Sequence, residues 1–106
     1  MNPASPTFWN QADQYFDLEY YTDYIIAETY IGNTDWPYNN IKMYQSDATG
    51  YRWRFCAIDF ELALEPDGWE DCTFDAIDFI QNYDPSNKYI NIWHKAMLNG
   101  TYKNYF

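Results

Sequence analysis

A chain of 106 residues can bury one hydrophobic core but not two, so we expect a single domain, 1–106, or a fragment of one. Sixteen acidic residues against six basic ones give a formal charge of -10, which opposes binding to nucleic acid or to anionic membranes. No apolar run approaches membrane-spanning length, and the N-terminus lacks the basic and apolar regions of a signal peptide. Either the protein is soluble inside the cell, or the chain has been cut from a longer exported one.

Aromatic residues make up 23% of the chain, which excludes a disordered tail. Tyr in such numbers can line a groove for a sugar or a peptide, but it also builds cores in domains short of Leu and Val, and we favour the core. The two cysteines, Cys56 and Cys72, have no metal-ligand spacing. Both a disulfide and two free thiols therefore stay open.

The N-terminal part of the chain predicts an irregular lead-in and then one long helix. Residues 1–9 carry two prolines. From about Gln11 to Ile31 there is no Gly or Pro, and apolar residues recur at spacings of three and four, as on one face of an amphipathic helix. Gly32 and Asn33 then predict its end, because both tolerate the left-handed conformation that closes a helix.

A loop and a hairpin follow. Residues 35–40 predict a loop, because Pro37 disfavours helix for the residue before it and the Asn pair favours turns. Residues 41–45 and 51–58 then predict two strands around a turn that Gly50 closes.

The register of this hairpin can be predicted from its turn. In an antiparallel pair the numbers of opposing residues have a constant sum, here about 97 to 99. This register places Asp59 within about one cross-strand neighbour of Asn40.

The C-terminal part predicts two or three helices. After an acidic loop at 65–71, Thr73 is the predicted N-cap of a helix that ends near Asn82. Ser86 begins a second helix, which runs to about Asn99, and the last residues predict a further helical turn. The predicted fold class is α+β.

Three side chains around the hairpin are the parts that a phosphoryl-transfer site uses. Asp35 and Asn40 have the spacing Asp-x-x-x-x-Asn, and Asp59 begins the triplet Asp-Phe-Glu after the second strand. In protein kinases one carboxylate orients the attacking hydroxyl, while an amide oxygen and a second carboxylate hold magnesium on the nucleotide. The alternative is structural: Asp35 caps a turn, Asn40 ends the hairpin and Asp59 begins a loop.

Three stretches resemble the CotH family of spore-coat-type protein kinases, namely YFDLEYYTDYIIAETYIGNTDWPYNNIKMYQ, YRWRFCAIDFELAL and YINIWHKAMLNGTYKNYF. The resemblance runs from about residue 15 to 106, and its most specific residues are Asn33, Asp35, Trp36, Asn40, Trp53 and Asp59. It implies an atypical kinase fold that transfers phosphate from ATP to Ser or Thr of proteins, with Mg²⁺ or Mn²⁺. It also implies a secreted, cell-surface or spore-coat location, and secreted or surface proteins as the substrates.

The same resemblance implies roles for single residues. Asp35 would be the catalytic aspartate, Asn40 a metal or phosphate-side ligand, and Asp59 the principal metal ligand, so that Asn40 and Asp59 together hold the metal and nucleotide. Glu61 falls where the family has its second acidic residue. Glu is one methylene longer than Asp, so Glu61 either reaches the metal from a shifted backbone or does not reach it.

The part of a kinase that covers ATP has no counterpart in the sequence. The four glycines stand alone, and Lys42 is the only lysine before residue 88, so neither a glycine-rich loop nor its partner lysine is present. We therefore expect the C-terminal, catalytic-lobe part of a CotH-like kinase, similar to the helical lobe of a kinase and with little activity alone. A short relative that has lost ATP binding is the other explanation.

The rival function belongs to a different class. In it the chain is a non-catalytic exported surface module that binds protein or glycan through exposed aromatic side chains, Trp36 and Trp69 among them. Such a module would tolerate the loss of Asp35 and Asp59.

Overall fold

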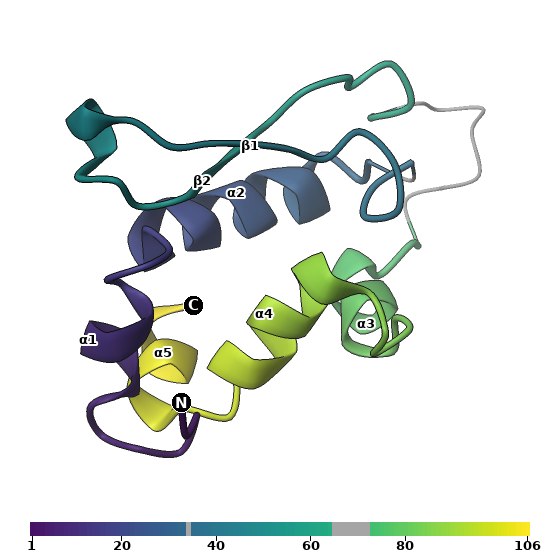
Figure 1. Ribbon diagram of the computed structural model, residues 1–106. Coiled ribbons are helices and arrows are strands. Elements are labelled where there is room, and N and C mark those ends of the chain that lie inside the picture. The colour runs from purple at the N-terminus through teal and green to yellow at the C-terminus, as the bar shows by residue number, and fades with distance from the viewer. Residues whose placement is uncertain (34, 65–72) are drawn as a thin grey trace.

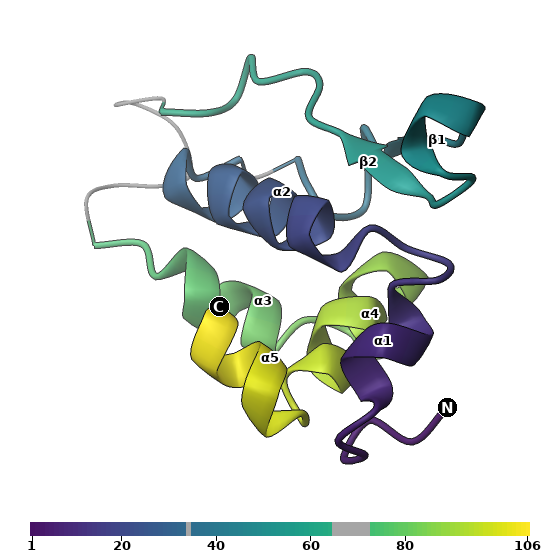
Figure 2. The same cartoon turned by 90° about the vertical axis from the view of Figure 1, so that its left-hand side faces the viewer.

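The computed structural model describes residues 1–33, 35–64 and 73–106. Its elements in chain order are α1 (Phe8–Ala12), α2 (Leu18–Tyr30), β1 (Lys42–Tyr44), the 3-10 helix η1 (Asp47–Thr49), β2 (Arg54–Cys56), α3 (Ala76–Gln81), α4 (Lys88–Ala96) and α5 (Gly100–Tyr105). The strands form a hairpin on one side of α2, and the other helices lie on its opposite side (Figures 1 and 2). The predicted α+β class is confirmed.

The single helix predicted from about residue 11 to 31 is wrong in its first part, because α1 ends at Ala12 and α2 begins only at Leu18. In the connection between α1 and α2, Phe16 makes an isolated parallel bridge with Trp53, the residue directly before β2. Asp17 then caps α2: its backbone is extended, and its carboxylate accepts a hydrogen bond from the Tyr20 N–H at 3.3 Å. A contact with a residue far along the chain therefore interrupts a locally uninterrupted helical pattern.

The end of α2 and the hairpin follow the prediction. Gly32 has φ 60°, and Gly50 closes the turn with φ 61°. The paired residues are Lys42 with Cys56, Met43 with Phe55 and Tyr44 with Arg54, which lies within the predicted register, although both strands are shorter than predicted.

The helix starts are set by Asp and Asn side chains. Asp75, not Thr73, caps α3, because its carboxylate accepts the Asp78 N–H at 2.9 Å. Asn87 caps α4, one residue after Ser86, the predicted start, and Asn99 caps the C-terminal helix α5. The irregular lead-in predicted for residues 1–9 is too long, because α1 begins at Phe8. The helical tail is confirmed.

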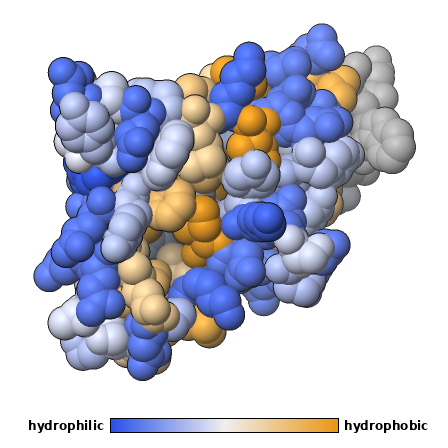
Figure 3. All heavy atoms as spheres, viewed as in Figure 1, coloured by the Kyte–Doolittle hydropathy of each residue, from blue (hydrophilic) through white to orange (hydrophobic). Residues whose placement is uncertain are grey.

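The core is aromatic, as predicted. Buried rings come from α1, α2, the loop after α2, β2, α4 and α5, namely Phe8, Tyr21, Tyr24, Trp36, Phe55, Trp93 and Tyr102. The Tyr21 and Phe55 rings lie 5.1 Å apart between their centroids and join the hairpin to α2. Other apolar side chains stay at the surface. Figure 3 shows a band of apolar residues that forms a hollow, with hydrophilic residues on both sides.

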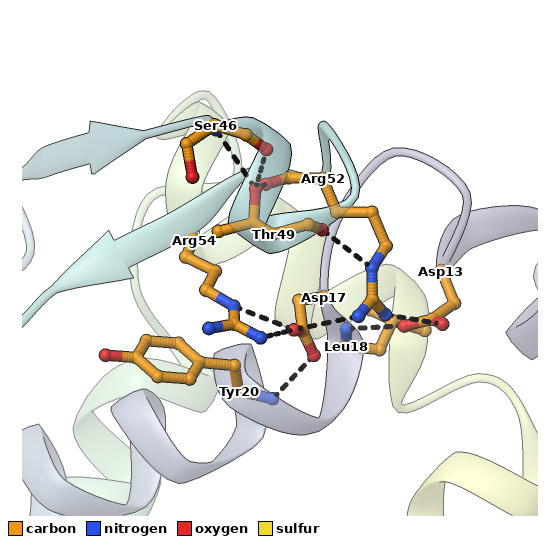
Figure 4. Close-up of polar contacts among 8 residues, drawn as sticks. All are labelled: Asp13, Asp17, Leu18, Tyr20, Ser46, Thr49, Arg52 and Arg54. Atoms are coloured by element: carbon orange, nitrogen blue, oxygen red, sulfur yellow. Dashed lines mark hydrogen bonds and ion pairs between the residues drawn. The ribbon is translucent and has the colours of Figure 1, made fainter.

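Ion pairs also join the hairpin to the start of α2 (Figure 4). Arg54 lies 2.6 Å from the Asp17 carboxylate, and Arg52 bridges Asp13 and Asp17 at 2.8 and 3.2 Å. Burial alone would raise the pKa of Asp17, but the hydrogen bonds from Arg54 and the Tyr20 N–H and the charges of both arginines lower it below its ordinary value. Arg52, which lies before β2, and Arg54, which begins it, therefore attach the hairpin to the start of α2.

No helix in the described part of the chain is long and apolar enough to cross a membrane. Cys56 is a free thiol, and Cys72 lies outside the described residues, as do the predicted acidic loop at 65–71 and Trp69.

Candidate functional site

The loop after α2 brings two of the predicted site residues together. The Asn40 Nδ2 donates a hydrogen bond to Asp35 Oδ2 at 2.7 Å, and the Asn39 Nδ2 donates to Asp35 Oδ1 at 2.8 Å. Both oxygens of the Asp35 carboxylate are therefore held in a fixed direction by neutral amides. The sequence pattern missed Asn39, although its spacing of four from Asp35 allows a loop to fold back on itself.

Contacts with α2 and with the start of α4 hold this loop. The Trp36 side chain is buried, with its ring edge-on to Tyr24 of α2 at 6.0 Å, and the Trp36–Pro37 peptide is cis. The Pro37 carbonyl accepts a hydrogen bond from Asn87 Nδ2, at the cap of α4, at 3.1 Å. Because Trp36 is only 3% exposed, it is not available as a contact of the rival binding module.

Two of the predicted metal ligands have an unusual backbone. Asn40 has φ 56° and Asp59 has φ 57°, both in the left-handed region. Asn and Asp tolerate this region better than other side chains, yet it still costs free energy, and such positions cluster at functional sites. The two residues that flank the hairpin, Asn40 before β1 and Asp59 after β2, therefore share the same left-handed backbone conformation.

Asp59 and Glu61 lie on an exposed turn after β2. Within the described residues, neither makes a hydrogen bond or ion pair with Asp35 or Asn40, and no three His, Cys, Asp or Glu side chains converge as a metal site. The metal roles of Asn40, Asp59 and Glu61 stay predictions. Their oxygen donors are of the kind that Mg²⁺ and Mn²⁺ prefer. Because Asn40 uses its Nδ2 to bind Asp35, its amide oxygen Oδ1 is the atom that it could offer to a cation.

A buried pair connects the end of α2 to the turn at Asp59. Asn33 Nδ2 donates to Glu28 Oε2 at 2.9 Å and lies 3.5 Å from the Asp59 carbonyl oxygen. The Leu64 N–H also donates to the Ile31 carbonyl at 2.9 Å. The same helix end therefore holds the loop that carries Asp35 and the turn that carries Asp59.

Glu28 itself is almost completely buried, and its burial raises the pKa of the carboxyl more than the hydrogen bond from Asn33 lowers it. Asn33 Oδ1 is also buried and has no hydrogen-bond partner among the described residues. Asn33 was predicted only as a helix-end and motif residue. A Glu five positions before an Asn, across a helix end, was the available signal for this pair.

The fold and loop together define an α+β domain with oxygen donors at the base of a β-hairpin. One family model, described as CotH kinase protein, matches residues 2–106. The chain therefore belongs to the CotH kinase family, as its sequence motifs indicated. No curated protein matches the chain, and no solved structure matches it either.

Proposed function

We propose that this chain is the catalytic-lobe segment of a protein kinase that transfers phosphate from ATP to Ser or Thr of secreted or surface proteins. The observation that carries the proposal is the hydrogen bond of 2.7 Å between Asn40 and Asp35, which joins the two ends of the Asp-x-x-x-x-Asn spacing. Family membership supports it independently.

In this proposal Asp35 is the catalytic carboxylate. The two amide donors fix the carboxylate plane, so that one oxygen lone pair can accept the proton of a substrate hydroxyl. Asn39 and Asn40 are neutral, so they orient Asp35 without cancelling its charge. This is the task of an aspartate that aligns a hydroxyl for attack on phosphorus.

Asn40, Asp59 and Glu61 are the proposed cation ligands. Asn40 would offer its amide oxygen, and Asp59 and Glu61 their exposed carboxylates. A bound Mg²⁺ or Mn²⁺ would neutralise charge on the phosphates of ATP. The Asn33 amide supports the position of Asp59 by its contact with the Asp59 backbone carbonyl.

Exchange of Asp35 for Asn tests the proposal. In the product of the complete gene, we expect Asp35→Asn to lower phosphate transfer by roughly 10²- to 10⁴-fold, because the proton acceptor is lost while the size of the side chain is kept. The measurement is transfer of labelled phosphate from ATP to a Ser/Thr protein substrate.

The matched control is Asp23→Asn, which removes one exposed carboxylate of α2 outside the site. It should leave transfer unchanged. Wild-type transfer by Asp35→Asn would contradict the role of Asp35.

A further inference from the structure

A second feature lies away from the Asp35 loop, in the band seen in Figure 3. A groove of about 480 Å³ runs between α1 and α4. Its apolar lining includes Phe8, Ala12, Phe16, Leu18 and Ile92. A volume of this size falls in the range of binding pockets, most of which are apolar with a few polar groups.

The charge at this groove differs from that of the chain as a whole. Lys88 and Lys95 carry the charged side chains that line it, Met1 with its terminal amine lines it as well, and no Asp or Glu does. The whole chain has six basic residues against sixteen acidic ones, so two of its few cations lie at one apolar groove. Both lysines are exposed, and neither makes an ion pair within the described residues.

The two lysines have a regular spacing along α4. They are seven residues apart on a helix, which places them about 10 Å apart along its axis, with Asn91 and Ile92 between them on the same face. A ligand with a single anionic head can pair with only one of them. Two anionic groups at this separation, with apolar groups between, match the whole groove.

We infer that this groove docks a short amphipathic helix of a partner protein, with acidic residues at positions i and i+7 and apolar residues at i+3 and i+4. Such a helix laid along α4 has the same rise per residue, so its acidic side chains come into register with Lys88 and Lys95 while its apolar side chains enter the groove. The site does not depend on phosphate transfer.

The test uses the 106-residue chain and a fluorescent peptide of about 15 residues, long enough to form a helix on binding. The peptide carries two Glu and two Leu in the stated pattern on an Ala/Gln background. We expect saturable binding by anisotropy, with NMR shift changes at Ala12 and Ile92. Replacing both Glu by Gln, or both Leu by Ser, should weaken binding.

Charge reversal provides the matched comparison. Lys88→Glu with Lys95→Glu should raise the Kd about tenfold, while Lys42→Glu with Lys103→Glu, an equal change in net charge outside the groove, should change it little. A peptide with Lys in place of both Glu should prefer the first variant.

Equal weakening by both double variants would show unspecific attraction and overturn the inference. Absence of peptide binding would overturn it as well. If the peptide does not bind but dodecanoate saturates the groove, the groove belongs to a ligand with a single anionic head.

Discussion

Glu28 and Asn33 show at the residue scale how the interior of this protein supports the candidate site. Glu28 is 1% exposed, and Asn33 donates a hydrogen bond to it while facing the carbonyl of Asp59. Burial holds the Glu28 pKa above its ordinary value. The folded protein therefore binds a proton at Glu28 more tightly than the unfolded chain does.

This raised pKa predicts a pH-dependent stability. The contribution of Glu28 is fully present below its unfolded value of about 4.5 and is lost as pH rises through the folded pKa. Glu28→Gln keeps an oxygen that can accept the Asn33 hydrogen bond but cannot ionise. We expect the variant to gain stability relative to wild type between about pH 4 and about pH 7, measured as the free energy of unfolding in urea.

Glu19→Gln, an exposed position of the same helix, is the control and should show a smaller change with pH. A difference between Glu28→Gln and wild type that stays constant across this range would contradict the raised pKa.

At the scale of elements, the attachment of the hairpin to α2 depends on Asp17, which caps the helix and pairs with Arg54 of β2 and with Arg52 just before that strand. Asp17→Asn should lower the free energy of unfolding by about 2 kcal/mol at neutral pH, because a largely buried carboxylate loses its charge between two guanidinium groups. Chemical denaturation measures this.

The pH dependence of that loss follows from the lowered pKa of Asp17. The stability it contributes is present above the unfolded value of 3.8 and disappears as pH falls through the folded pKa. The difference between Asp17→Asn and wild type should therefore shrink below about pH 4, while Asp23→Asn stays close to wild type throughout. A difference that persists undiminished in acid would count against the ion pairs.

Elements set by local rules were predictable from the sequence. Gly50 and the alternation around it determined the hairpin register, and Gly32 marked the end of α2. The break before α2 was not predictable, because it depends on the bridge between Phe16 and Trp53, which only the folded chain brings together. The Asp75 cap was missed because Thr73 fits the same rule two residues earlier.

The candidate site likewise combines a contact that the sequence predicts with one that it does not. The pairing of Asp35 with Asn40 lies within one loop and follows from a spacing of five. The support of Asp59 by Asn33 joins residues 26 positions apart, and no periodicity indicates such a contact.

On the scale of the whole molecule, α2 lies between the hairpin and the helical layer, and its C-terminal end holds both halves of the candidate site. Asn87 of α4 fixes the Pro37 carbonyl from the opposite layer. The loop of Asp35 and the turn of Asp59 are therefore both positioned by contacts with these helices, as a shared site requires.

Whether Asp35 and Asp59 serve one site is tested most directly by a double-mutant cycle in the phosphate-transfer assay. In the product of the complete gene, we expect Asp35→Asn and Asp59→Asn each to lower the transfer rate by roughly 10²-fold or more, and the double variant to be little worse than the poorer single one, because residues that act as a unit are not additive. A wild-type rate for Asp59→Asn, or effects that multiply in the double variant, would contradict the shared site.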